Sequence, residues 1–416
     1  MNVEVIVIGG GPAGMMAAGR AAAAGATVVL LEKNRRVGKK LLITGGGRCN
    51  VTNEIGDRHE LVARYGGDSK GLHSVFARFS PEMMRTFLRE RGLETKVENE
   101  GRVFPITNSA ASVREVLERF LEEGHVMVRS KSTVRELLVD KARVRGVMLD
   151  GGERLKADAV IVATGGVSRP ETGSTGDGFR FLSQAGHSVR EPEPSLVPVS
   201  VRESWVGELQ GISLPEAKLS AWLDGRKQFD GTGKLLFTHF GLSGPLVLNL
   251  SQRINELAQG GPVELQIDVF PKIDGGEMER AFQATFDAQP GKKLRNVVGE
   301  LMPPRLAAAV LERASVDGET RCHSVAKSDR RALASTAKAL SMTFAGLLGE
   351  EKAVVSSGGV LPAEIDFRTM ESKRVSGLYV VGDMIDVNRQ SGGYSLQLCW
   401  ATGWVAGESA AARMLE

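Results

Sequence analysis

The chain has 416 residues, which is more than one hydrophobic core usually organises, so we expect two or three domains. Its 53 Lys and Arg residues nearly balance its 50 Asp and Glu residues, and no basic run indicates a nucleic-acid partner. No apolar run has the length of a membrane span, and the first apolar segment begins at residue 3, which leaves no room for a secretion signal. These features predict a soluble, cytoplasmic protein.

The cysteines and histidines show neither a disulfide framework nor a metal-binding pattern. Cys49, Cys322 and Cys399 are odd in number and far apart, which is typical of a reducing compartment. None of the six histidines is paired at the spacing of a metal site. We therefore expect no bound metal.

The first 32 residues carry the pattern of a dinucleotide-binding unit. A buried strand at residues 3–8 meets a glycine turn, and then come a helical pattern and a second apolar strand. Gly9 permits the tight turn, Gly11 lets the backbone approach a pyrophosphate, and Gly14 lets the helix pack closely on the strand. The N-terminus of the helix offers unpaired N–H groups to the phosphates.

The second strand ends in Glu32, 18 residues after Gly14. A carboxylate there accepts hydrogen bonds from an adenosine ribose and disfavours a 2′-phosphate. The pattern therefore indicates FAD or NAD rather than NADP, and it does not decide between the two.

Further elements follow along the first half of the chain. Residues 38–53 form a loop rich in glycine and basic residues. Apolar periodicity predicts helices at 81–91 and 109–123, extended chain at 93–98, strands at 126–129, 134–139 and 144–149, a buried strand at 159–163, and a helix starting near 176.

The sequence pattern changes near residue 192, where several prolines follow one another closely. Residues 195–346 are expected to be an inserted region, with a β-rich part at about 195–273 and a helical part at about 274–340. Helical patterns lie at 277–286, 305–314 and 329–340, and parallel-sheet character returns at 353–357 and 377–383. The nucleotide domain is therefore predicted to be discontinuous, made of residues 1–194 and 347–416.

The last part of the chain carries a second candidate site. Gly382 and Asp383 follow an apolar strand, and residues 392–397 open a helical pattern that runs to about 414. If the ligand is a flavin, this helix N-terminus suits the N1 and C2 carbonyl edge, where negative charge gathers on reduction. Asp383 would then accept hydrogen bonds from ribityl hydroxyls.

Four runs, at 9–14, 43–53, 163–166 and 382–394, together resemble the bacterial NAD(P)/FAD-dependent oxidoreductases of the aminoacetone oxidase-like, BaiN-like family. The run Gly-Gly-Gly-Arg-Cys-Asn-Val-Thr-Asn is the most specific, and the similarity covers essentially the whole chain. The resemblance implies an α/β fold. It consists of a Rossmann-type FAD-binding module of the two-dinucleotide-binding-domain type, interrupted by a β-barrel-like domain and a small helical domain.

The resemblance also implies which residues hold a non-covalent FAD. The glycine turn and Glu32 would hold the adenosine diphosphate half, Lys40 and residues 44–50 would approach the pyrophosphate and flavin, and the C-terminal run would hold the ribityl and ring end. The candidate cofactor-binding residues are Gly9, Gly11, Pro12, Ala13, Gly14, Glu32, Lys33, Lys40, Thr44, Gly46, Arg48, Cys49, Asn50, Val134, Ala163, Thr164, Gly165, Gly382, Asp383, Gly393, Tyr394, Ser395 and Leu396. Ser395 departs from the family, which commonly has Asn there, so the role of that amide toward the flavin is open in this chain.

Two features separate this chain from flavin-dependent disulfide reductases. Cys49 has no partner cysteine within several residues, and dithiol exchange needs a second sulfur, so we expect a small packed residue. No second GxGxxG lies between residues 150 and 300, which disfavours a separate NADPH-binding Rossmann unit. The glycines at 173–178 are better explained as a turn before a helix.

Two residues are candidates for catalysis. His239 lies in a glycine-rich apolar loop of the inserted region, where an imidazole facing the flavin could move a substrate proton, although a turn or packing role is the simpler interpretation. Arg102 could pair with a substrate carboxylate or with flavin charge, and a solvated arginine is the alternative.

The sequence thus predicts an FAD-dependent oxidoreductase that exchanges a hydride between flavin N5 and a small organic substrate lying between the FAD module and the inserted domain. NAD(P)H is a candidate electron donor, and an oxygen-using amine or hydroxyl oxidase is the alternative within this class. Alternatives of another class are a flavoprotein of tRNA modification, which predicts basic surface stripes, and a non-catalytic flavin redox sensor. We expect no nucleic-acid or membrane partner, and the sequence leaves the substrate and the oligomeric state open.

Overall fold

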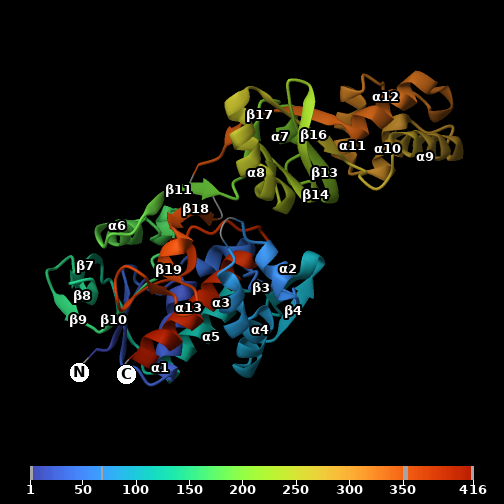
Figure 1. Cartoon of the computed structure of the whole chain (residues 1–416). Coiled ribbons are helices and arrows are strands. Elements are labelled where there is room, and N and C mark those ends of the chain that lie inside the picture. Colours follow the sequence, from blue (N-terminus) through green and yellow to red (C-terminus); the bar gives the residue numbers. More distant parts are fainter. Residues whose placement is uncertain (1–2, 67–68, 350–354, 414–416) are drawn as a thin grey trace. The chain divides into compact units, whose positions relative to one another are not determined.

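A computed structural model describes residues 3–66, 69–349 and 355–413. The chain forms two compact units, one made of Met1–Pro194 with Ala353–Glu416 and the other of Ser195–Lys352. We call them the Rossmann unit and the barrel unit (Figure 1).

The Rossmann unit is built on a seven-stranded sheet of order β19-β20-β21-β10-β1-β2-β6. Five consecutive strands of this order, from β21 to β6, are parallel. Every residue of β1, β2 and β10 is buried, as their short continuous apolar runs predict. The strands are β1 Val5–Ile8, β2 Val28–Glu32, β6 Met127–Ser130, β10 Ala159–Val162, β19 Ile365–Asp366, β20 Glu371–Ser372 and β21 Leu378–Val380.

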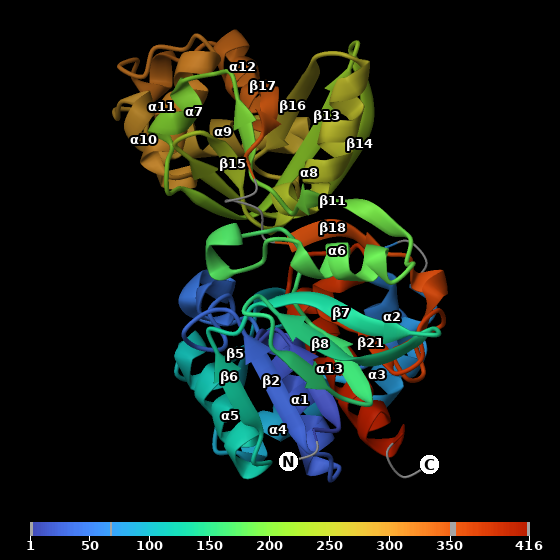
Figure 2. The same ribbon diagram turned by 90° about the vertical axis from the view of Figure 1, so that its left-hand side faces the viewer.

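Two long helices pack against each other beside this sheet (Figure 2). They are α1 (Pro12–Ala23) and α13 (Tyr394–Ala412). A Cβ added at Gly403 would lie 2.4 Å from the Ala13 carbonyl oxygen, and one added at Gly407 would lie 2.3 Å from that of Ala17. Because position 403 meets 13 and position 407 meets 17, the helices run in the same direction, and glycine permits their close approach.

Smaller elements complete the Rossmann unit. Two antiparallel three-stranded sheets have the orders β3-β5-β4 and β7-β8-β9, and β11 pairs with β18. These strands are β3 Thr52–Asn53, β4 Thr95–Glu98, β5 Arg102–Pro105, β7 Val134–Asp140, β8 Arg143–Leu149, β9 Arg154–Lys156, β11 Val189–Ser195 and β18 Val355–Val360. The helices are α2 Arg58–Ala63, α3 Leu72–Arg78, α4 Pro81–Glu90, α5 Ala110–Glu123 and α6 Asp177–Gln184, with short 3₁₀ turns η1 Leu41–Gly47, η2 Asn99–Gly101, η3 Pro170–Thr172, η6 Pro362–Glu364 and η7 Gly382–Met384.

The parallel-sheet character expected at 353–357 is only partly correct. Residues 353 and 354 lie outside the described residues, and β18 pairs with β11 rather than joining the main sheet. The strand expected within 377–383 is confirmed, since β21 lies parallel to β10.

The barrel unit contains a closed six-stranded barrel of order β12-β15-β14-β13-β16-β17. Its strands are β12 Val199–Val201, β13 Ser213–Leu223, β14 Arg226–Thr238, β15 Gly241–Ser243, β16 Val263–Asp268 and β17 Leu340–Leu347. Its helices are α7 Trp205–Glu208, α8 Pro245–Leu257, α9 Gly275–Ala288, α10 Leu294–Leu301, α11 Pro304–Arg313 and α12 Lys327–Lys338, with 3₁₀ turns η4 Ala258–Gly260 and η5 Cys322–Ser324.

The helices α9 to α12 come between β16 and β17, so the strand that closes the barrel follows the helical part in the chain (Figure 1). The helical pattern expected to reach residue 340 ends at Lys338, and residue 340 instead begins β17. Barrel residues such as Leu219 and helix residues such as Phe282 belong to one buried apolar cluster. The β-rich and helical parts therefore share a core.

Within the described residues, none of the helices combines the length and the apolar character that crossing a membrane requires.

Candidate functional site

The glycine turn between β1 and α1 has two glycines that the fold itself requires and one that borders open space. Gly9 has φ +102, and a Cβ added at Gly14 would lie 1.9 Å from the Gly9 carbonyl oxygen. At Gly11, the N-cap of α1, an added Cβ would meet no protein atom within 4 Å. The arrangement leaves room for a ligand to approach the backbone of Gly11, at a helix N-terminus that favours phosphate. Pro12 and Ala13 form the first turn of this helix.

Glu32 ends β2 as a buried carboxylate aimed at the glycine turn. Its Oε2 accepts a hydrogen bond from Gly10 N at 2.8 Å, and its Oε1 accepts from Asn34 N at 2.7 Å and from Asn34 Nδ2 at 2.8 Å. Each carboxylate oxygen has two lone pairs, so Oε2 retains acceptor capacity toward a ribose hydroxyl. The protein thus fixes the carboxylate, and its bond to a ribose stays a prediction.

The loop after Gly38 presents backbone in an unusual conformation. Gly45 and Gly46 have φ of +56° and +68°, and an added Cβ at Gly46 would meet nothing within 4 Å. The side chain of Asn50 lies beside this loop, and its Oδ1 is buried without a hydrogen-bond partner in the structure. A buried acceptor without a donor is costly. FAD carries hydroxyl and imide donors, so this loop fits it.

Two polar side chains of the same loop, those of Thr44 and Arg48, are occupied by protein partners. Thr44 Oγ1 donates to Leu41 O at 2.7 Å. Arg48 stacks over the Phe104 ring at 4.1 Å and pairs with Glu98, whose pKa this hydrogen bond lowers. Their roles toward the cofactor stay predictions.

Cys49 is fully buried with φ +60, and burial raises the pKa of its thiol to about 12. It is a free cysteine, and at neutral pH it is a thiol rather than a thiolate. This supports its interpretation as a packed residue.

The C-terminal segment meets the glycine turn in space, although nearly 370 residues separate them in the chain. A Cβ added at Gly382 would lie 3.1 Å from Ala13 Cβ and 3.4 Å from Cys399 Sγ. Gly393, the N-cap of α13, has φ +101, and its added Cβ would lie 2.4 Å from Thr52 O. The N-terminus of α13 therefore packs on the strand that follows the glycine loop.

The end of β10 joins the same region. Thr164 Oγ1 lies 3.0 Å from Met384 Sδ, in η7. Gly165 has φ +76, with an added Cβ 3.1 Å from Ser174 Oγ. Ala163 is the residue whose carbonyl oxygen would lie 2.6 Å from an added Cβ at Gly9. The ends of β1 and β10, η7 and the start of α13 thus surround one location, which is where a ligand of an open α/β sheet binds.

The remaining predicted residues of the Rossmann unit have protein partners or are buried. Lys33 Nζ bonds to Thr175 Oγ1 and Asp177 Oδ2, at 2.6 and 2.7 Å. Val134 is buried at the start of β7. Tyr394 accepts a hydrogen bond on its carbonyl from Tyr65, and Leu396 is buried.

Lys40, Asp383 and Ser395 have as partners two residues that the sequence did not indicate, Ser168 and Arg389. Lys40 Nζ donates to Ser168 Oγ at 2.9 Å, and burial lowers the pKa of Lys40 although the Asp383 carboxylate opposes this. Arg389 forms an ion pair with Asp383 and donates from Nε to Ser395 Oγ at 2.9 Å. No local pattern reveals that these two polar residues are buried.

The two candidate catalytic residues belong to different units. Arg102 begins β5 of the Rossmann unit, where its Nε donates to Asn99 O at 3.0 Å and lies 3.7 Å from Glu100. His239 is exposed in the turn between β14 and β15 of the barrel unit, with its ring 4.9 Å from that of Phe240. Their catalytic roles stay predictions.

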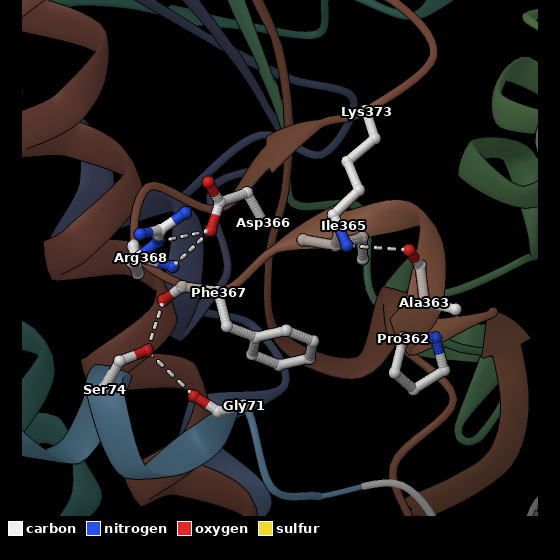
Figure 3. A pocket seen from close by; sticks show the side chains of 9 residues that line it. All are labelled: Gly71, Ser74, Pro362, Ala363, Ile365, Asp366, Phe367, Arg368 and Lys373. Atoms are coloured by element: carbon white, nitrogen blue, oxygen red, sulfur yellow. Dashed lines mark hydrogen bonds and ion pairs between the residues drawn. The ribbon is translucent and has the colours of Figure 1, made fainter.

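A separate cavity of about 290 Å³ lies between the start of α3 and the β19–β20 hairpin (Figure 3). Its polar groups bond to one another: Ser74 Oγ to Phe367 O at 3.0 Å and Lys373 Nζ to Ala363 O at 2.9 Å. It shares no lining residue with the candidate cofactor site. Among the residues that the structure describes, no group of three or more His, Cys, Asp or Glu could hold a metal ion.

The Rossmann sheet, the glycine turn with Glu32 and the C-terminal helix segment together define an FAD-dependent oxidoreductase. More particularly, residues 3–409 match the family described as HI0933-like protein Rossmann domain, so the chain belongs to this family.

The chain is 31% identical over 375 residues to the 3-dehydro-bile acid delta(4,6)-reductase of Clostridium scindens, covering 90% of each chain. It is 30% identical to the ribosomal RNA dihydrouridine synthase of Escherichia coli, covering 88% of each. Among solved structures, 3-ketosteroid delta1-dehydrogenase from Sterolibacterium denitrificans has the same fold, with a TM-score of 0.56 and 14% identity over 99% of this chain and 100% of that one. These similarities confirm the fold class and the family that the sequence motifs predicted.

Proposed function

We propose that this protein is an FAD-dependent reductase of a carbon–carbon double bond conjugated to a carbonyl group, with NAD(P)H as electron donor. The observation that carries the proposal is the meeting of the glycine turn, the end of β10 and the Gly382 turn in one unit. This arrangement offers two helix N-termini and exposed glycine backbone to a single extended dinucleotide.

The names of the relatives narrow the reaction class. A delta(4,6)-reductase acting on a 3-dehydro bile acid saturates double bonds conjugated to the C3 carbonyl. A dihydrouridine synthase saturates the C5–C6 double bond of uridine, which is conjugated to the C4 carbonyl. Both reactions add a hydride and a proton to a polarised double bond, and this shared chemistry is what we assign to the present chain.

Bound FAD would supply the hydride at N5. The residues of this chain would supply binding and charge. The N-terminus of α1 and the Gly11 backbone would hold the pyrophosphate, Glu32 the ribose, and Asp383 the ribityl chain. The N-terminus of α13 would favour negative charge at the N1 edge. His239 is the proposed proton donor and Arg102 the proposed partner of substrate charge.

A second candidate function is the reduction of uridine in ribosomal RNA. Two relatives, from Escherichia coli and Haemophilus influenzae, carry that name at 30% identity. The net charge of +3 gives this chain no general electrostatic attraction for RNA. Such an enzyme would have to recognise the RNA mainly through local contacts.

The test is anaerobic reduction of the FAD-loaded protein by NADH or NADPH, followed by addition of a candidate acceptor. A 3-oxo-4,6-diene bile acid should reoxidise the flavin, and its saturated 3-oxo counterpart should not. An unmodified ribosomal RNA transcript serves the second candidate, with dihydrouridine measured by mass spectrometry. If an amine or an alcohol reduces the flavin and oxygen reoxidises it, the protein is an oxidase instead. Failure of both nicotinamides to reduce the flavin would contradict the proposal.

A further inference from the structure

Arg389 is a buried cation at the C-terminal part of the candidate FAD site. It lies in the segment between η7 and α13, and only 7% of the residue is exposed. Burying a guanidinium is costly unless its N–H groups are paired. Here Nη1 donates to Val387 O at 2.9 Å, Nε donates to Ser395 Oγ at 2.9 Å, and Nη2 pairs with Asp383 Oδ1.

Two of these partners belong to the predicted cofactor site. Asp383 is the proposed acceptor for ribityl hydroxyls, and Ser395 stands in the first turn of α13 where the family commonly has Asn. A single guanidinium therefore fixes both side chains. Its planar set of donors holds them in one geometry, which a lysine could not do.

The hydrogen bond also gives the side chain of Ser395 a partner within the protein. The Ser395 hydroxyl accepts from Arg389 Nε, so in this chain its oxygen serves the arginine. Arg389 itself is anchored by an isolated β-bridge to Tyr65. The hydrogen bond therefore couples the positions of the Arg389 and Ser395 side chains.

The charged groups around Arg389 are Asp383 and Lys40. Arg389 faces Asp383, and Lys40 lies close enough to both for its pKa to respond to each of them. Cys399 stays neutral because burial raises its pKa. Loss of Arg389 would leave the Asp383 carboxylate without its ion-pair partner, and a negative charge there would disfavour a reduced, anionic flavin.

We propose that Arg389 is a positioning residue for the flavin, which orients Asp383 and Ser395 at the ribityl and ring end and neutralises Asp383. The proposal rests on the proposed function, because it assumes that FAD binds at this site. It goes beyond that function by assigning a specific role to a residue that is not among the predicted cofactor-binding residues.

The test compares three variants of Arg389 and its partners with a matched control. R389Q removes the charge, R389K keeps the charge without the planar donor set, and S395A removes one acceptor. The control is R190Q, because Arg190 is an exposed arginine that pairs at 3.0 Å with Asp386 of the same segment. For each full-length protein we would measure the Kd of FAD by reconstitution and the Kd of sulfite for the flavin, which reports flavin electrophilicity without turnover.

We expect R389Q to raise the Kd of FAD by about 10- to 100-fold, the range for loss of a charged hydrogen bond. R389Q should also weaken sulfite binding, because Asp383 is left uncompensated. R389K should weaken FAD binding but retain sulfite affinity, S395A should have a smaller effect on FAD, and R190Q should match the wild type in both.

The proposal is overturned if R389Q folds and binds FAD and sulfite as R190Q does. If R389Q does not fold, the double variant D383N/R389Q removes both charges of the pair. Its FAD Kd should still exceed that of the wild type while its sulfite Kd returns toward the wild-type value, and wild-type values for both constants would overturn the proposal. A wild-type protein that takes up no FAD contradicts the proposed function itself, a result seen before any variant is made.

Discussion

Gly11 and Gly14 belong to the same turn, but only Gly14 is required by the packing of the protein. At Gly14 a side chain collides with the Gly9 carbonyl oxygen, whereas at Gly11 it meets no protein atom. Gly14 therefore serves the packing of α1 on β1, and we propose that Gly11 leaves room for the ligand.

Substitution of each glycine by alanine separates these two roles. Gly14→Ala should lower the free energy of unfolding by about 1–3 kcal/mol, as overpacking does. Gly11→Ala should change it by no more than about 1 kcal/mol, because φ −79 suits alanine, yet raise the Kd of FAD about tenfold or more. The measurements are chemical unfolding of the apoprotein and FAD titration. Equal FAD affinity in Gly11→Ala and the wild type would contradict close approach of the pyrophosphate.

Cys49 provides a second test at the scale of a single residue. Because its pKa is raised to about 12, very little thiolate exists at neutral pH. Cys49→Ser should leave the rate of flavin reduction by NAD(P)H unchanged, and iodoacetamide should not inactivate the folded protein. Loss of flavin reduction in Cys49→Ser, with FAD occupancy intact, would show that the thiol takes part in electron transfer.

Residue-level prediction from the sequence works best where local spacing fixes the backbone. The structure has the tight turn at Gly9 and the close packing at Gly14 that the spacing indicates, whereas the approach of a pyrophosphate to Gly11 stays a prediction. Arg389 and Ser168 could not be predicted, because burial of a polar side chain depends on partners that lie far away in the chain.

The connection between α6 and β11 is tied to the β19–β20 hairpin by a buried histidine. His187 Nδ1 lies 2.8 Å from Glu364 Oε2, and its Nε2 lies 2.8 Å from Ser372 Oγ. Burial lowers the pKa of His187, despite the opposing effect of Glu364. For Glu364, burial acts to raise the pKa, but hydrogen bonds from Arg374, Ser188 and His187 outweigh it and lower the pKa to about 2.

The stability of the Rossmann unit should therefore depend on pH. Above pH 6.5, the ordinary pKa of histidine, His187 is neutral in both states, and its contribution is constant. As the pH falls below 6.5 the unfolded chain binds a proton that the folded chain resists, so stability is lost, with a slope of at most about 1.4 kcal/mol per pH unit for one group. The contribution of Glu364 is present above pH 4.5 and is lost separately, as the pH falls from 4.5 toward 2.

Urea unfolding followed by circular dichroism between pH 5 and 8 checks this prediction. His187→Gln should be less stable at pH 8 and should lose part of the pH dependence below 6.5. The control is His59→Gln, which changes an exposed histidine of α2. A wild-type slope below pH 6.5 identical to that of His187→Gln would be evidence that another group is responsible.

Elements were predictable where the apolar pattern is local, and less so where partners are distant. The helices α4 and α5 follow from apolar periodicity, and the buried strands β1, β2 and β10 follow from short continuous apolar runs. By contrast, β18 joins β11 rather than the main sheet, and β17 closes a barrel whose other strands end about 70 residues earlier. Strand pairing depends on tertiary contacts, which periodicity does not contain.

On the scale of the whole molecule, residues from both ends of the chain build the candidate cofactor site, and residues 195–352 form a unit of their own. The cofactor and the substrate therefore have to be argued from different parts of the chain. The Rossmann unit carries the candidate dinucleotide site, and the proposed substrate class rests on the relatives and on residues such as His239.

His239 can be tested against a matched residue of the same unit. If it donates the substrate proton, His239→Gln should lower kcat with the candidate acceptor by about 10²- to 10⁴-fold while flavin reduction by NAD(P)H is unchanged. His323, an exposed histidine whose Nδ1 lies 2.8 Å from Pro290 O, is the control. An equal kcat in His239→Gln and His323→Gln would exclude His239 as the proton donor.

The central claim is that the chain binds FAD and takes electrons from a nicotinamide. An anaerobic absorbance titration of the FAD-reconstituted protein with NADPH, and then with NADH, tests it directly. We expect flavin absorbance bands that bleach with one of the two donors. Absence of flavin bands, together with no uptake of added FAD, would contradict it.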